Sequence, residues 1–108
     1  MLILIADIYF YTIEDNAQAL KHELSTEVIL RPAINFGNDL LFSGTIIADS
    51  TTNSLIRGKW YNVAIEMPTV ENEGYNCIKH LVNVDAEIKI QLASRIIGYG
   101  RINDFAFE

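Results

Sequence analysis

Three side chains have the chemistry of nucleophiles or general bases: His22, His80 and the single cysteine, Cys77. Nucleophilic catalysis needs a nucleophile, a base and an orienting group within hydrogen-bond reach of one another. His22 is flanked by Lys21 and Glu23, which predicts a solvated surface residue, and His80 precedes an apolar pair, which predicts a partly buried residue beside a strand. No basic cluster surrounds Cys77, so an unactivated thiol is expected. We therefore expect no catalytic residues and no enzyme, unless His80 and Cys77 meet across the fold.

The cysteine and histidine content also bears on metals and on compartment. A single cysteine cannot form an internal disulfide, and no second cysteine or paired histidine lies near it at zinc-ligand spacing. We expect no metal site and no cofactor, and a reducing cytoplasm is the simplest location.

The glycine-containing motifs do not predict a nucleotide site. Gly98 and Gly100 resemble the start of a dinucleotide fingerprint, but Asn103 stands where the third glycine belongs, and eight residues follow Gly100. The only Gly-Lys pair, at 58–59, is followed by tryptophan and not by the serine or threonine of a phosphate-binding loop. Nucleotide hydrolysis is not expected.

The charge is strongly acidic and uneven. The chain has 14 acidic and 8 basic residues, a net charge of -6 and a pI of about 4.8. Residues 1–54 carry seven acidic residues against two basic ones. Such a balance disfavours binding to nucleic-acid phosphates and favours long-range attraction of a basic protein partner.

Alternation of apolar and polar residues predicts an all-β fold. Period-two patterns and turn signals predict six strands, at residues 2–10, 28–36, 40–48, 61–67, 87–92 and 96–105. Pro32 makes the second an edge or irregular strand, and Gly44 marks a bend in the third. The expected core is Leu4, Ile8, Phe10, Ile34, Phe42, Ile46, Val63, Ile65, Ile88, Ile90 and Ile97.

The remaining segments are expected to be loops or a short helix. Residues 71–74 are polar and predict a solvated loop. Asp15 is a plausible helix N-cap, and both a short helix and an ordered loop fit residues 16–27. The apolar residues 1–6 are too few for a signal peptide or a membrane span, so no membrane association is expected. With 108 residues, half of them hydrophobic, the chain predicts one domain, residues 1–108, folded as a single six-stranded antiparallel β-barrel.

Four local motifs occur in an order that resembles a known barrel. Residues 6–10 (A-D-I-Y-F) are similar to A-E-V-Y-V, and residues 31–36 (R-P-A-I-N-F) with 43–46 (S-G-T-I) are similar to R-P-x-F-x-F and T-G-x-I. Residues 56–63 stand at the place of a P-G-D turn and its strand, and residues 95–102 (R-I-I-G-Y-G-R-I) are similar to R-T-V-G-x-G-V-V. The chain thus resembles the third, C-terminal β-barrel domain of the elongation factor Tu family over nearly its whole length.

The resemblance implies a barrel fold and a binding surface. In that family the domain helps to hold the aminoacyl-tRNA stem and contacts partner proteins, while the GTPase domain has no counterpart in this chain. Among the matched positions, Arg31, Lys59 and Arg95 are those that could meet a phosphate. For the arginines, stacking over the barrel end against a backbone or carboxylate partner is the structural alternative. The family's E-x-G-G-R loop is replaced by the acidic insertion at residues 16–27.

Two functional hypotheses follow. The first is a non-catalytic module that binds a basic protein, such as the immunity protein of a bacterial toxin. Its expected contact residues are the carboxylates in and directly before the insertion and two aromatic residues: Glu14, Asp15, Glu23, Glu27, Trp60 and Tyr61. The second is a translation-associated barrel that binds RNA or tRNA. It requires Arg31, Lys59, Arg95 and Arg101 to gather on one face.

Overall fold

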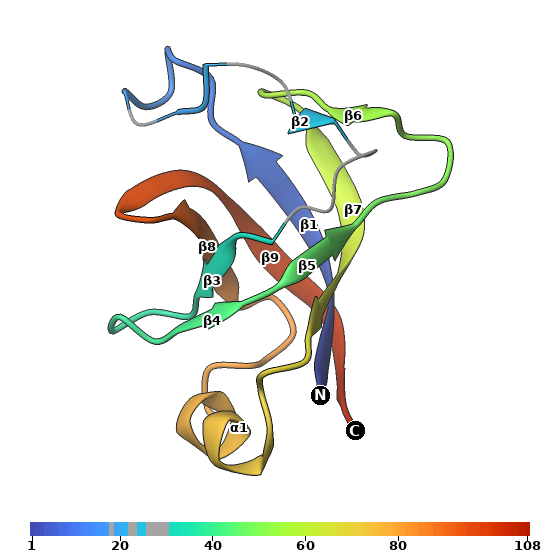
Figure 1. Ribbon diagram of the computed structural model, residues 1–108, viewed down its shortest axis with the longest axis vertical. Coiled ribbons are helices and arrows are strands. Elements are labelled where there is room, and N and C mark those ends of the chain that lie inside the picture. Colours follow the sequence, from blue (N-terminus) through green and yellow to red (C-terminus); the bar gives the residue numbers. More distant parts are fainter. Residues whose placement is uncertain (18, 22–23, 26–30) are drawn as a thin grey trace.

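The computed structural model describes residues 1–17, 19–21, 24–25 and 31–108, and its main feature is an antiparallel barrel-like sheet (Figure 1). Seven strands follow one another in the order β4-β3-β8-β9-β1-β7-β5, and every hydrogen-bonded pair is antiparallel. Their bounds are β1 Leu2–Phe10, β3 Ala33–Asn35, β4 Leu41–Ser43, β5 Thr45–Ile47, β7 Trp60–Met67, β8 Glu87–Leu92 and β9 Arg95–Phe107. A separate two-stranded ladder pairs β2 (Leu24–Ser25) with β6 (Ser54–Leu55).

The two edges of this sheet belong to one run of chain, which nearly closes the barrel. β4 and β5 are separated only by Gly44; β4 pairs with β3, and β5 pairs with β7. The chain crosses from one edge of the sheet to the other at Gly44. A Cβ atom there would lie 2.7 Å from Cγ2 of Ile65, so a larger residue would collide with the core. The expected all-β barrel with a bend at Gly44 is confirmed. The count differs by one because the predicted strand at 40–48 is divided into two.

Strand β1 lies between β7 and β9 in the sheet, and its alternate residues are buried. The inward residues of β1, β7 and β8 form most of the core, because each of these strands alternates apolar and polar positions. All of the expected core residues are buried except Phe42. Phe42 is partly buried and packs against the core, with its ring centroid 6.4 Å from that of Phe36.

The expectation of a loop at residues 71–74 is wrong, because the chain there enters the helix α1 (Asn72–Ile78). This helix covers the end of the barrel where the two termini lie (Figure 1). Ile78 is fully buried, and the Tyr75 ring stacks on Phe107 of β9 with centroids 4.1 Å apart and planes at 5°. Such packing of an apolar face stabilises a short helix that is too short to persist alone.

The described residues of the insertion between β1 and β3 lie at the opposite end of the barrel from α1 (Figure 1). Its described residues form turns and the short strand β2, and the structure assigns no helix to them. The backbone N–H groups of Asp15 and Asn16 both donate to the Thr12 carbonyl, and Ala19 is buried. Glu23 and Glu27, which were expected to be contact residues, and His22 lie outside the described residues.

Candidate functional site

A row of outward-facing side chains crosses four neighbouring strands near the insertion. Lys89 on β8 is opposite Tyr99 on β9, Tyr99 is opposite Tyr9 on β1, and Tyr9 is opposite Trp60 on β7. These residues face outward because the alternate positions beside them, such as Ile8 and Ile90, are buried in the core. Register alone therefore brings together side chains from four separate parts of the sequence.

Four of the aromatic rings at this place form a cluster, here called the aromatic patch: Tyr9, Tyr11, Trp60 and Tyr99. The Tyr9 ring lies 5.4 Å from the Trp60 ring and 5.7 Å from the Tyr99 ring, measured between centroids. Tyr11 stacks on Tyr99 at 5.6 Å. Trp60 remains 53% exposed. Large aromatic clusters are usually buried, so this outward-facing cluster, with Trp60 exposed and the three tyrosines partly exposed, is a candidate binding surface.

A second, polar row runs directly beside the aromatic one. Glu87, Arg101, Asp7 and Asn62 are opposite one another across β8, β9, β1 and β7. The Asn62 amide donates to Oδ1 of Asp7 at 3.1 Å, and this bond lowers the pKa of Asp7 below its ordinary value. Between the two rows lies an open hollow of about 580 Å³ lined by Asp7, Trp60, Asp85, Glu87, Tyr99, Gly100 and Arg101.

Lys89 connects the two rows at one side of the hollow. Its Nζ lies 2.6 Å from Oε1 of Glu87 and 5.6 Å from the centroid of the Tyr99 ring. The hydrogen bond to Glu87 raises the pKa of Lys89. One ammonium group is thus held between an aromatic ring and a carboxylate.

Asp15 joins the insertion to the aromatic patch. The Tyr9 hydroxyl donates to Oδ2 of Asp15 at 2.6 Å, and the same oxygen accepts the Thr12 N–H at 3.1 Å. The bond from Tyr9 lowers the pKa of Asp15, and it raises the pKa of Tyr9 because it favours the protonated phenol. The predicted contact residue Asp15 therefore lies at the edge of the patch. Glu14 is exposed in the same turn.

The two aromatic residues expected to act together face different sides of β7. Trp60 belongs to the exposed aromatic patch. Tyr61 lies on the core side, partly buried, and its hydroxyl accepts the Ile56 N–H at 3.0 Å. Adjacent strand residues point to opposite faces, so only one of the two can meet a partner at the patch.

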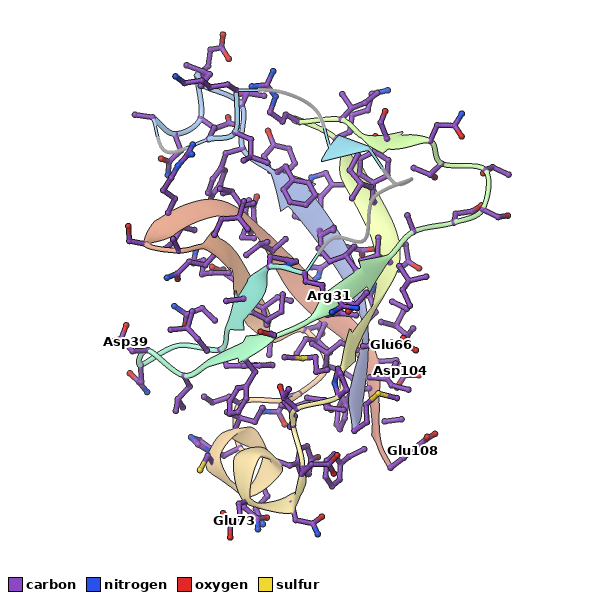
Figure 2. The ribbon with its side chains drawn as sticks, in the orientation of Figure 1. Arg31, Asp39, Glu66, Glu73, Asp104 and Glu108 are labelled. Carbon is purple, nitrogen blue, oxygen red and sulfur yellow. The ribbon has the colours of Figure 1, made fainter. Side chains whose placement is uncertain are left out.

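The four basic residues of the RNA hypothesis lie on different elements. Arg31 is exposed just before β3, where Figure 2 labels it, and Lys59 is exposed just before β7. The Arg95 guanidinium, at the start of β9, donates to the Ala19 carbonyl at 2.8 Å. A backbone partner of this kind was the expected alternative to phosphate binding by this arginine. Arg101 lies in the polar row, with Nε 3.9 Å from Oδ1 of Asp85.

Two of the three candidate catalytic residues, Cys77 and His80, lie at the end of the barrel covered by α1. Cys77 is exposed in α1, and His80 is exposed shortly after it, so the expectation of a partly buried histidine beside a strand is wrong. Both come from one segment and do not face each other across the barrel. Within the described part of the chain, no three histidine, cysteine or carboxylate side chains come together as metal ligands.

Sequence reasoning missed three members of the aromatic patch: Tyr9, Tyr11 and Tyr99. The alternation of apolar and polar residues predicts that these tyrosines lie on the outer face of their strands. Their contact with one another depends on the pairing register of β9 with β1, which the alternation does not give. Tyr9 and Tyr99 are 90 residues apart in the chain and directly opposite in the sheet.

The fold and the patch define a mostly β, barrel-like domain with an outward-facing aromatic surface. Comparison with known protein families finds no family whose sequence pattern matches this chain, and comparison with curated proteins finds no significant match. Among the described residues, no helix has the length and apolar character that crossing a membrane requires.

Proposed function

We propose that this protein is a non-catalytic binding module that captures a basic protein partner through the aromatic patch and the carboxylates beside it. The observation that carries the proposal is the outward-facing row of Trp60, Tyr9 and Tyr99, in which Trp60 is exposed and the two tyrosines are partly exposed. Tyrosine and tryptophan dominate the energetics of protein interfaces when they lie at the centre and are desolvated on binding.

Charge supports a basic partner. Four carboxylates surround the patch: Asp7, Asp85 and Glu87 line the hollow, and Asp15 binds Tyr9. The whole chain carries a net charge of -6, which would attract a basic protein from a distance and raise its association rate.

The biological role that fits this proposal is neutralisation of a basic toxin in the bacterial cytoplasm, as by an immunity protein. A small acidic domain needs only to cover a functional surface of its partner, so it requires no catalytic group. The similarity of the motifs to the third domain of elongation factor Tu is consistent with a barrel that contacts partner proteins. A toxin gene beside the gene for this chain would support the role, and a consistent position among translation genes would contradict it.

A salt-dependent pull-down tests the proposed function. The bait is compared with a Trp60→Ala/Tyr99→Ala variant of the same fold, checked by circular dichroism. We expect a basic protein to be retained at about 50 mM salt, to be released at about 500 mM, and to be lost from the variant. Recovery of no basic protein would contradict electrostatic capture. So would a basic protein whose binding is unchanged by salt and by the double substitution.

RNA is the second candidate, because the outward-facing aromatic rings beside Lys89 could also stack nucleobases. The carboxylates that surround the patch disfavour it, since they repel phosphates. A titration of tRNA at low salt separates the two hypotheses, with Trp60, the only tryptophan of the chain, as the fluorescent reporter. Saturable quenching by tRNA that disappears as salt rises would favour the RNA hypothesis.

A further inference from the structure

We propose that the hollow between the aromatic and polar rows receives an arginine side chain of the partner protein. This inference rests on the proposed function and specifies the contact that gives it selectivity. The hollow has a volume of about 580 Å³ and is open to solvent beside Trp60, Tyr99 and the backbone of Gly100.

The rings provide surfaces on which a planar cation can stack. Trp60 and Tyr99 have centroids 5.3 Å apart and planes at 81°, so they form two sides of a corner. Trp60 is more than half exposed, which leaves ring surface for a ligand. Tryptophan is the side chain that attracts a cation most strongly over its face.

The carboxylates of the hollow provide the hydrogen-bond acceptors. Asp7, Asp85 and Glu87 line it against one cation, Arg101. The contact between Arg101 Nε and Asp85 Oδ1 measures 3.9 Å, which is longer than a hydrogen bond, and both side chains are mostly exposed. The Asp85 carboxylate therefore keeps lone pairs that an incoming guanidinium can use.

A cation of the chain itself already occupies a comparable environment. Lys89 lies over Tyr99 and hydrogen-bonds to Glu87 at 2.6 Å. The combination of a ring face and a carboxylate favours a positive charge there, as the raised pKa of Lys89 also indicates. A partner cation on the other side of the same ring would meet similar groups.

Guanidinium fits this arrangement better than ammonium. An arginine side chain can stack its plane on an indole or phenol ring and still direct two N–H groups to a carboxylate. A lysine ammonium offers a compact charge without a plane, and it is more strongly hydrated. The hollow should therefore discriminate between the two basic residue types.

The test uses Trp60 fluorescence and two blocked peptides of equal charge, tetra-arginine and tetra-lysine. We expect tetra-arginine to bind the intact protein about five- to tenfold more tightly, which corresponds to one stacked cation at a partly exposed site. In Tyr99→Leu the preference should shrink toward unity while the carboxylates remain.

Charge-matched variants separate the hollow from the net charge. Asp85→Asn with Glu87→Gln should weaken tetra-arginine binding more than Glu73→Gln with Asp104→Asn, although each pair removes one aspartate and one glutamate charge. Figure 2 shows Glu73 on α1, at the other end of the molecule, and Asp104 near the termini, on the far part of β9.

The outcomes distinguish this inference from the proposed function. Equal affinities for the two peptides, or equal losses in the two charge-matched variants, would overturn the arginine site and leave capture of a basic protein intact. Absence of binding by either peptide at low salt, together with a failed pull-down, would overturn both.

Discussion

Gly98 and Gly100 determine how closely β9 approaches β1, and Tyr99 lies between them. A Cβ atom on Gly98 would collide with the Tyr9 carbonyl oxygen, and one on Gly100 would lie 2.6 Å from the Asp7 carbonyl oxygen. These atoms are backbone, so they cannot move aside without breaking the register that assembles the aromatic patch. The close approach of β9 to β1 therefore requires glycine at both positions.

Gly98→Ala should therefore destabilise the fold by about 3 kcal/mol, at the upper end of the usual cost of overpacking. Chemical denaturation followed by Trp60 fluorescence measures this loss. Gly37→Ala is the matched control, because Gly37 has a φ of +107° but nothing within 4 Å of the added Cβ. It should cost about 1 kcal/mol from backbone strain alone. Similar losses in both variants would mean that the contact with β1 is not tight.

The hydrogen bond from Tyr9 to Asp15 predicts a pH effect. The pKa of Asp15 is lowered from its ordinary 3.8, chiefly by that bond. A lowered pKa in the folded state means that the ionised carboxylate stabilises the fold above pH 3.8, and that this contribution is lost as the pH falls through the lower folded value. In Tyr9→Phe, the Asp15 pKa should rise toward 3.8, measured by NMR of the carboxyl carbon. In the control Tyr99→Phe, the pKa of Asp15 should stay at its lowered value. An unchanged Asp15 pKa in Tyr9→Phe would show that the bond does not form.

Among the elements, the insertion depends on two arginines of the barrel for its position. Arg95 at the start of β9 donates to the Ala19 carbonyl, and Arg57, before β7, donates to the Leu20 carbonyl. Both bonds join the acidic segment to the barrel end, next to the aromatic patch. An arginine that the RNA hypothesis assigned to phosphate thus has a structural partner.

Arg95→Gln should release the insertion without unfolding the barrel. Lys21 is exposed directly after the two anchored carbonyls, so trypsin should cleave there several-fold faster in the variant, because cleavage requires local opening. Arg101→Gln is the control, since Arg101 lies in the polar row of the sheet and its contact with Asp85 is long. Mass spectrometry of the first fragments identifies the cut. Cleavage after Lys21 at equal rates in both variants would contradict the anchoring role.

The insertion's carboxylates remain candidates for steering a partner. Changing Glu14, Glu23 and Glu27 together to glutamine should slow association with a basic partner by about tenfold at low salt and leave the melting temperature nearly unchanged. Asp15 is left intact because it holds Tyr9. Stopped-flow Trp60 fluorescence measures the association rate. An unchanged rate would mean that the partner is attracted by another face.

For the molecule as a whole, the strands that alternate strictly were predictable from the sequence, and their arrangement was not. β1, β7 and β8 bury one face, and period two is visible along each of them. α1 was missed because Gly74 and the polar residues around it give a weak helical signal, while contacts such as that of Tyr75 with Phe107 come from a distant strand. The aromatic patch was missed for the same reason: register between strands is a property of the closed barrel and not of any local segment.

The antiparallel pairing of β1 with β9 places residues 1 and 108 side by side, which predicts that the order of the elements can be permuted. The Met1 amine donates to the Glu108 carbonyl at 2.7 Å, and the Glu108 N–H donates to the Met1 carbonyl at 3.0 Å. A short glycine-serine linker can therefore join residue 108 to residue 1 without strain. New ends between Thr51 and Thr52 would fall in an exposed turn outside every strand of the barrel.

This permutant should keep the β-type circular dichroism spectrum and the Trp60 emission of the original, with a melting temperature lower by about 5 °C at most, since only an exposed turn is cut. The matched control opens the chain between Ile97 and Gly98, inside β9. That cut divides the strand that pairs with both β1 and β8, so the control should not fold. A folded control, or an unfolded permutant at 51–52, would contradict the view that continuity of β9, rather than the order of the elements, holds the barrel together.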